Sequence, residues 1–474
     1  MAGLKIPKQP LQAENFPWKL ALWSYLLSYF FILLFLKSYF WDDWYVYFTF
    51  TGDGTKKLFE EYGYQPWHGF FQVEVLNSRP EIFRLITIVC FFLSGWCLFH
   101  ILKTVKFLTA EQIKLITILF LVFPINSARV AMITFAYSYS FLLFFLAWYL
   151  LITKRFLVVR ALSVPLFLMS FSTLSFLVFF AVPCANLLYK NLSVASPNKK
   201  RAYLSTGLLA VLSPVYWIVN RRINSLSDAR LAYLTPTRLG IARGLLVLVV
   251  CLIFILWYLK LRRNNASVNS RYPIILAGVT ITALGAFPYI TSGRLVDVSE
   301  WMLNFVPRAS DWDSRHQLVL GLGLAVTLVG LISPIDSTFK RPSFNVLIGL
   351  CVALNITYMH GYYLDSLKQD QMISAIRDSD ELAESRFVMI DDTTDRFNAR
   401  GRGYRSYEWD GILAKALGDS TRTVIDMGYV DCNDPLTPVP DTLLIITARN
   451  GRFESTLTRD IGIELSVESI QPCK

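Results

Sequence analysis

The chain has 474 residues, and its 46 lysines and arginines against 35 aspartates and glutamates give a formal net charge of +11. It is 54% hydrophobic and only 17% charged, whereas a soluble domain carries about 25% charged residues. These values exclude a disordered chain, a collagen-like chain and an ordinary cytosolic enzyme. The apolar stretches are continuous and do not alternate, which favours a helical membrane protein over a membrane barrel.

The apolar runs, taken in chain order, predict an all-α polytopic membrane domain of about eleven transmembrane helices, because one span needs about 20 apolar residues. The spans around Val164 and Phe179 are separated only by residues 170–173, so they form either a short hairpin or one bent helix. The predicted centres are Tyr29, Phe92, Leu119, Phe141, Val164, Phe179, Ala210, Cys251, Val279, Ala325 and Ala353.

Lysine and arginine gather in alternate loops, and the excess of positive charge in cytoplasmic loops places the amino terminus in the cytoplasm. With eleven spans, the carboxyl-terminal domain then lies outside. The amino-terminal region lacks a cleavable signal pattern, so we expect the first span to be a retained anchor. The expected location is the cytoplasmic (inner) membrane, with the carboxyl-terminal domain in the periplasm or, in a Gram-positive cell, at the exterior.

The charge also divides the chain into two predicted domains. Residues 363–474 hold 13 basic and 20 acidic side chains, a net charge of −7, whereas residues 1–362 are at +18. We therefore predict a multi-spanning catalytic domain at residues 1–362 and a small exported soluble α/β domain at residues 363–474. In the second domain we expect helices at 367–382 and 406–417, and strands at 386–390, 423–425 and 442–446.

Two features of the second domain leave alternatives open. Residues 391–395 are rich in aspartate and follow a predicted strand, so they form either a polar turn or a site for a cation or a sugar. Cys432 and Cys473 either form a disulfide in an exported domain or remain free thiols.

The first outside loop opens with Trp41-Asp42-Asp43-Trp44, directly after the first predicted span. Aromatic residues suit the headgroup layer of the membrane. Placing two adjacent carboxylates at the same depth near the membrane costs free energy, so a compensating interaction or a function is expected for them. The acidic pair either caps the next segment or pairs with Lys37, or it has a functional role.

Arginines in the outside loops contradict the positive-inside bias, so something must offset their charge. An anionic substrate would do so, because the planar guanidinium donates two parallel hydrogen bonds to a phosphate. The alternatives are anionic lipid headgroups and, for the last arginine, a snorkelling side chain at the interface. The candidates are Arg129, Arg221, Arg222, Arg308 and Arg315, the last followed by His316.

These motifs resemble the GT-C superfamily of polyprenyl-phosphate-sugar-dependent membrane glycosyltransferases. The resemblance rests on Asp42-Asp43, on Ser78-Arg79-Pro80 before the second span, and on Ser314-Arg315-His316 before a late span. It covers residues 1–362 by architecture and about a dozen positions by motif.

The resemblance implies an inverting transfer of a sugar from a polyprenyl-phosphate donor to a glycan, lipid or protein acceptor at the outer face of the membrane. Asp42 or Asp43 would act as general base, and Arg79 and Arg315 would help to hold the donor phosphate or the sugar. It also implies a possible divalent cation, Mg²⁺ or Mn²⁺, although no second-loop acid near Arg129 would complete such a site.

Two other functions stay open. A polysaccharide polymerase or O-antigen ligase with a polyprenyl-diphosphate donor would depend on the outside arginines and His316 rather than on Asp42 and Asp43. A transporter of lipid-linked oligosaccharides predicts charges within the spans and internal repeats, neither of which is evident. Nucleic acid is not an expected partner, because the basic residues are spread over the loops of a membrane domain.

Overall fold

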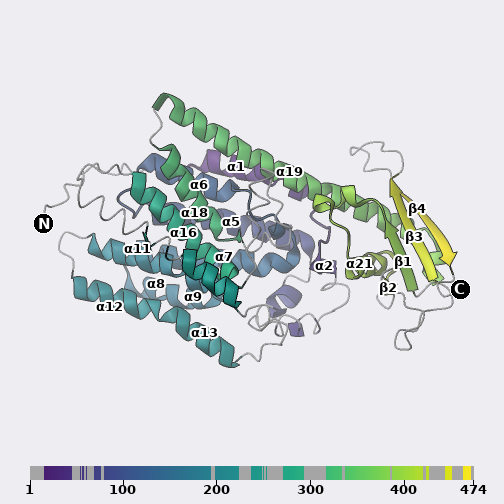
Figure 1. Cartoon of the computed structure of the whole chain (residues 1–474), viewed down its shortest axis with the longest axis horizontal. Coiled ribbons are helices and arrows are strands. Elements are labelled where there is room, and N and C mark those ends of the chain that lie inside the picture. Colours follow the sequence, from purple (N-terminus) through teal and green to yellow (C-terminus); the bar gives the residue numbers. More distant parts are fainter. Residues whose placement is uncertain are drawn as a thin grey trace.

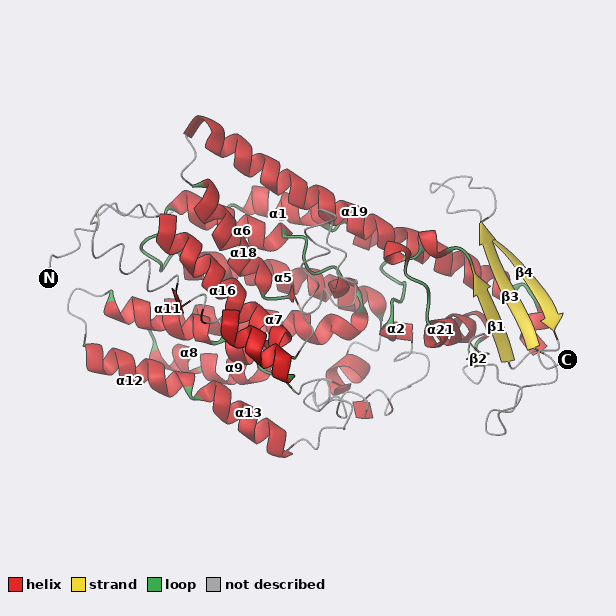
Figure 2. Cartoon of the chain, in the orientation of Figure 1, coloured by secondary structure: helices red, strands yellow, loops and turns green. Residues whose placement is uncertain are grey.

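The computed structural model describes residues 15–44, 54, 56–57, 60, 69–75, 79–193, 198–223, 236–247, 249, 252–253, 271–292, 317–333, 337–384, 387–419, 423–425, 443–450 and 463–470. Most of the described chain is helical, and a four-stranded sheet lies at its carboxyl-terminal end (Figure 1). Figure 2 shows the strands gathered at one end of the molecule, away from the bundle of helices.

The helices differ widely in length. In chain order they are α1 (Trp18–Ser28), η1 (Phe30–Leu34), α2 (Asp42–Trp44), η3 (Phe71–Val75), α5 (Pro80–Leu102), α6 (Ala110–Val122), η4 (Ala128–Val130), η5 (Met132–Thr134), α7 (Phe135–Thr153), α8 (Leu157–Ala161), α9 (Ser163–Ser170), α10 (Ser175–Phe179), α11 (Ala181–Leu192), α12 (Lys199–Ala210), α13 (Leu212–Ile223), α16 (Arg271–Thr291), α18 (Leu320–Ile332), α19 (Ser337–Arg377), α20 (Asp380–Glu384), η7 (Asp395–Phe397), η8 (Ala399–Gly401) and α21 (Ser406–Leu417).

Six helical stretches among the described residues are long and apolar enough to cross a membrane, rather than the predicted eleven. They match the predicted centres at Phe92, Phe141, Phe179, Ala210, Val279 and Ala353. They are Pro80–Leu102, Met132–Thr153, Ser175–Leu192, Lys199–Asn220, Tyr272–Thr291 and Pro342–Arg377.

The other predicted spans are shorter or interrupted, and the one at Cys251 lies outside the described residues. The helix at Tyr29 ends at Ser28 and continues as a 3₁₀ turn. α6 and α18 have 13 residues each, which is about 20 Å of helix against a hydrocarbon core of about 30 Å. α6 is short because Thr109 and Gln112 form a capping box at its start, and Pro124 follows its end.

The pair of predicted spans around Val164 and Phe179 is not one continuous helix. α8 and α9 cover 157–170 with a break at Leu162, and α10 begins only at Ser175, after a turn. The rings of Phe144 and Phe176 stack at 4.6 Å between α7 and α10, so aromatic packing joins this segment to the bundle.

α19 joins the helical bundle to the sheet (Figure 1). It has 41 residues, a length of about 60 Å, and the predicted domain boundary at 362/363 falls inside it. Near its outer end, Gln369 Nε2 donates to the carbonyl of Tyr39 at 2.8 Å. The helix therefore contacts the first loop before it reaches the sheet.

The sheet has the strand order β2-β1-β3-β4. β1 (Phe387–Asp392) is parallel to β2 (Thr423–Ile425) and to β3 (Leu443–Asn450), and β4 (Ile463–Ile470) is antiparallel to β3. α21 connects β1 to β2, as the sequence predicts. β4 was not predicted, although the start of its Ile-Glu-Leu-Ser-Val-Glu-Ser-Ile sequence alternates apolar and polar residues as a half-exposed strand does. We call residues 387–470 the α/β unit.

The first loop packs against the α/β unit through Trp44. This side chain is fully buried in a cluster with Ile373 of α19 and with Trp409 and Ile412 of α21. A Cβ atom on Gly411 would lie 2.8 Å from the Cβ of Trp44, so only glycine permits this close approach. The loop that carries the two candidate acids is therefore fixed against α21.

Candidate functional site

The two adjacent acids of the first loop lie in different environments. They form the short helical turn α2, and the preceding residue, Trp41, has a φ of +52°, which few side chains adopt outside strained or functional positions. The Trp41 side chain is buried against the Tyr362 ring at 5.6 Å, which holds this conformation. Asp43 then contacts the segment 128–134 between α6 and α7, and Asp42 contacts the α/β unit.

Asp43 anchors the first loop to the second. The side chain is fully buried, and its Oδ2 accepts hydrogen bonds from the backbone N–H groups of Met132 at 3.0 Å and Phe40 at 3.2 Å. Its Oδ1 accepts one from Ile133 at 2.9 Å. Burial raises the pKa of Asp43 to about 6, against the opposing effects of the nearby Arg84 guanidinium and the three N–H donors. Both carboxylate oxygens of Asp43 therefore accept hydrogen bonds from the protein backbone and are not available to a substrate.

Asp42 is only half-buried and contacts the start of α21. Its Oδ1 accepts a hydrogen bond from the Tyr407 hydroxyl at 2.9 Å. Burial and the negative charge of Asp42 raise the pKa of Tyr407, so the phenol keeps its proton at neutral pH and acts as the donor. Of the two acids, Asp42 is the one at an accessible position.

Arg84 is a central residue that the sequence analysis missed. It is 2% exposed, and its Nε donates to the Val130 carbonyl at 2.9 Å. Its Nη2 donates to the backbone carbonyl of Ser38 at 2.6 Å, and its Nη1 donates to the carbonyls of Phe35 and Leu36. The guanidinium therefore ties the end of the first apolar helix to η4. An arginine inside a predicted span was the signal that could have found it.

Arg129 is a buried cation in η4. It is 8% exposed, and its guanidinium lies 4.0 Å from the Tyr29 ring centre and 4.9 Å from that of Phe91. Its Nε has no hydrogen-bond partner, and no acid pairs with it among the described residues. Contacts with aromatic faces offset only part of the cost of burying a charge, so the site favours an anionic ligand.

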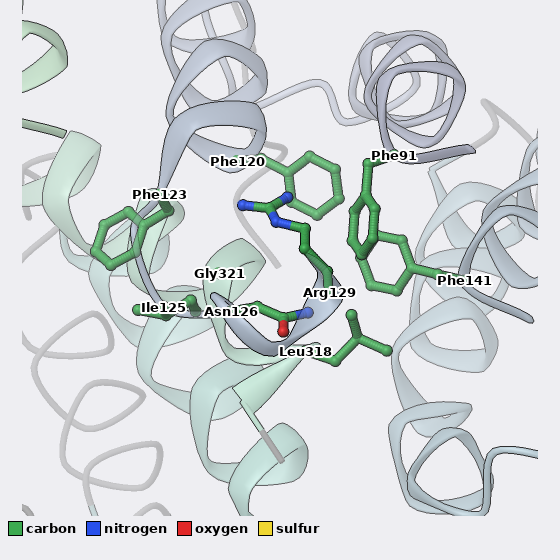
Figure 3. A pocket seen from close by; sticks show the side chains of 9 residues that line it. All are labelled: Phe91, Phe120, Phe123, Ile125, Asn126, Arg129, Phe141, Leu318 and Gly321. Carbon is green, nitrogen blue, oxygen red and sulfur yellow. The ribbon is translucent and has the colours of Figure 1, made fainter. Parts of the chain in front are cut away.

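The Arg129 side chain extends into a small cavity, as Figure 3 shows. Asn126 also faces this space, and its buried Oδ1 has no hydrogen-bond partner among the residues that the structure describes. The cavity measures about 20 Å³, enough for one water-sized group such as an anionic oxygen but not for a sugar ring. The lining residues are Phe91, Phe120, Phe123, Ile125, Asn126, Arg129, Phe141, Leu318 and Gly321.

The structure places the other predicted arginines only in part. Arg79 is exposed directly before α5, and Arg84 lies in the same helix about 7 Å further along its axis. Arg222 is exposed near the end of α13. The Arg221 side chain, Arg308, Arg315 and His316 lie outside the described residues, as do Cys432 and Cys473.

A second polar cluster joins α19 to the α/β unit. Lys368 Nζ lies 2.5 Å from Asp392 Oδ2, and both side chains are buried. Asp392 Oδ1 accepts from the Thr394 backbone N–H at 2.9 Å. Asp365 accepts from the Tyr404 hydroxyl. Within the aspartate-rich segment 391–395, Asp392 thus serves as an ion-pair partner and a turn acceptor.

The described residues do not offer a metal ion a suitable ligand set at the first loop. No group of three or more His, Cys, Asp or Glu side chains comes together in this part of the chain. Asp43 uses both carboxylate oxygens to accept backbone N–H groups, and Asp42 accepts from Tyr407. The divalent cation implied by the resemblance therefore has no fitting site in this arrangement.

No family model matches this sequence, and no curated protein matches it.

Proposed function

We propose that this protein is a membrane glycosyltransferase that moves a sugar from a polyprenyl-phosphate donor to a glycan, lipid or protein acceptor. The observation that carries the proposal is the short segment 126–133. Its backbone binds the first-loop acid Asp43, while Arg129 in the same segment extends into an aromatic cavity and has no acidic partner within the described part of the chain. Residues 126–133 therefore connect the Asp43 carboxylate to the Arg129 guanidinium.

Asp42 is the general base in this proposal, because Asp43 is fully buried and both of its oxygens are occupied. The acceptor hydroxyl gives its proton to the Asp42 carboxylate, and its oxygen forms a bond to the anomeric carbon of the sugar. The bond from that carbon to the phosphate oxygen breaks, and its electron pair leaves on the polyprenyl phosphate. Attack opposite the leaving group inverts the anomeric configuration.

The arginines hold the leaving phosphate and stabilise its charge. Arg129 receives one phosphate oxygen in its cavity, and the small volume leaves the sugar outside. Leu318 lines the same cavity, and Arg315 and His316 lie three and two residues before it in the sequence. This proximity supports assigning Arg315 and His316 to the donor as well. Arg308, seven residues before Arg315, and Arg79, directly before α5, are assigned with them.

The same proposal includes the topology. With the amino terminus in the cytoplasm and an odd number of crossings of the cytoplasmic membrane, the α/β unit lies outside the cell or in the periplasm. The six long apolar helices support a membrane location, and the contact between Asp42 and Tyr407 puts the base and the α/β unit on one side. The acceptor would then approach from the outside.

Purified protein in lipid nanodiscs tests the proposal with radiolabelled glucose, galactose, mannose and arabinose, each linked to undecaprenyl phosphate. Membrane extract supplies the acceptor. We expect Asp42→Asn to lower kcat at least about 100-fold, and Arg129→Ala to raise the donor KM at least about 10-fold. Asp378→Asn is the matched control, because Asp378 is exposed directly after the end of α19. Full activity of the Asp42→Asn/Asp43→Asn double variant would overturn the proposal.

A polysaccharide polymerase or ligase with a polyprenyl-diphosphate donor is the alternative. The burial of Asp43 favours it in one respect, because that acid is withheld from substrate. Under this alternative, activity would require Arg221, Arg222 and His316 and would tolerate the loss of Asp42. The same nanodisc assay with an undecaprenyl-diphosphate-linked glycan separates the two functions.

A further inference from the structure

The hydroxyl of Tyr407 reaches the candidate base from a part of the chain 365 residues away. Tyr407 lies in the first turn of α21, and the oxygen–oxygen distance to Asp42 is 2.9 Å. Both side chains are partly buried, which strengthens a hydrogen bond to a charged group relative to one in water. The α/β unit thus supplies a proton donor to an acid of the first loop.

Packing around this contact fixes the distance between α2 and α21. Trp44 is fully buried and lies against Gly411, one turn after Tyr407. The Lys415 ammonium lies 4.9 Å from the Tyr39 ring centre and 5.6 Å from that of Trp44. These contacts place the Tyr407 hydroxyl before any substrate arrives, so the hydrogen bond costs little ordering at the time of reaction.

We propose that Tyr407 is a positioning residue that holds the Asp42 carboxylate in the orientation that receives the acceptor proton. The inference rests on the proposed function and makes the α/β unit part of the active site. Tyr407 keeps its own proton throughout the step. The acceptor proton moves to Asp42, the acceptor oxygen bonds to the anomeric carbon, and the polyprenyl phosphate leaves with the electron pair.

Removing the phenol has a chemical consequence as well as a geometric one. A hydrogen bond to the charged carboxylate favours that form, so its loss raises the pKa of Asp42. The other charged groups near this contact are Asp43 in α2 and Arg405, Glu408 and Lys415 beside or on α21. All of them remain in Tyr407→Phe, and the change in pH dependence therefore reports the phenol.

The pair Tyr407→Phe and Tyr404→Phe tests the inference. Each removes one phenolic hydroxyl from the α/β unit, but Tyr404 donates to Asp365 rather than to Asp42. The assay is release of labelled sugar from the undecaprenyl-phosphate panel in nanodiscs between pH 5 and pH 9. We expect Tyr407→Phe to lower kcat about tenfold at unchanged donor KM, and to move the acid limb of kcat/KM up by about one pH unit.

The controls separate this inference from the proposed function. We expect Tyr404→Phe to show the same acid limb in the pH profile of kcat/KM as the wild-type protein. If Asp42→Asn is inactive while Tyr407→Phe matches the wild type in kcat and in pH profile, the positioning role is wrong and the base stands. If Asp42→Asn is fully active, the proposed function fails and the positioning role fails with it.

A second variant tests whether α21 must be docked. Gly411→Leu places a side chain where Trp44 lies, and it separates α21 from the first loop. We expect this variant to lower kcat at least as much as Tyr407→Phe does, while circular dichroism shows that the membrane helices stay folded. Wild-type activity in Gly411→Leu, with proteolysis showing a released α/β unit, would overturn the inference.

Discussion

The Asp43 carboxylate lies 2.9 Å from the backbone nitrogen of Ile133, 90 residues later in the chain. Through this contact and that with Met132, the loop that follows the first apolar helix is tied to the segment that carries Arg129. An acid next to a candidate base thus serves to hold two loops together. Four predictions follow from this arrangement and from the ion pair of α19.

Asp43→Ala should destabilise the protein much more than Asp42→Ala. The change leaves three backbone N–H groups buried without acceptors, which we expect to lower the free energy of unfolding by about 3 kcal/mol or more. Asp42 is half-buried, so its removal should cost about 1 kcal/mol or less. Thermal unfolding in detergent measures the difference, and equal Tm values for the two variants would contradict the anchoring role.

The stability that Asp43 contributes should fall as the pH rises. Its pKa is about 6 in the folded protein, against an ordinary value of 3.8, so the folded state keeps this proton to a higher pH than the unfolded chain. Its contribution is therefore fully present below about pH 4 and is lost between about pH 4 and pH 6, with an upper size of about 3 kcal/mol.

The Tm of wild type minus that of Asp43→Asn, followed from pH 4 to pH 7, isolates this effect. The asparagine cannot ionise, so the difference should decline through this range and then level off. A difference that does not vary with pH would show that the carboxyl group titrates alike in both states.

Arg84→Met should destabilise the membrane domain by about 3–5 kcal/mol, because it leaves the carbonyls that the guanidinium binds without donors. The matched control is Arg222→Met, which replaces an exposed arginine near the end of α13 and should change stability by about 0.5 kcal/mol at most. The temperature at which each variant aggregates in detergent compares their stabilities. If Arg84→Met were as stable as Arg222→Met, the role of Arg84 would be refuted.

Breaking the ion pair between Lys368 and Asp392 should loosen the α/β unit from α19. Lys368→Met leaves a buried carboxylate unpaired and should cost about 3–5 kcal/mol, whereas the double variant Lys368→Met/Asp392→Asn should recover part of this cost. Limited proteolysis of the full chain measures how readily the α/β unit separates from α19. Additive effects of the two single changes would mean that the pair is not coupled.

Hydropathy predicted the membrane helices where apolar runs are long and uninterrupted. Phe92 and Phe141 lie near the middle of such helices, whereas the run at Leu119 is cut by Pro124 and the run at Tyr29 breaks after Ser28. A window of apolar residues measures composition over its length, and it does not detect a local break in the helix. The count of eleven was too high for the described residues for this reason.

The candidate site was only partly predictable. The sequence identified Asp42-Asp43 as costly and in need of a partner, but it did not separate their roles, since those depend on contacts with Ile133 and Tyr407 far along the chain. Arg84 was missed because it lies within an apolar span, where hydropathy averages conceal a single charge. Its carbonyl partners belong to other segments, which no local pattern reveals.

α19 is a stiff rod about twice as long as the bilayer is thick. Its internal proline, Pro342, lies near the end opposite the sheet, and the helix continues unbroken past Lys368. A tilt of the membrane end must then move the sheet end as one piece with the first loop, because Gln369 binds the Tyr39 carbonyl and Trp44 packs against Gly411. Such a tilt would therefore reorient the α/β unit relative to the bilayer surface while leaving the contact between Asp42 and Tyr407 in place.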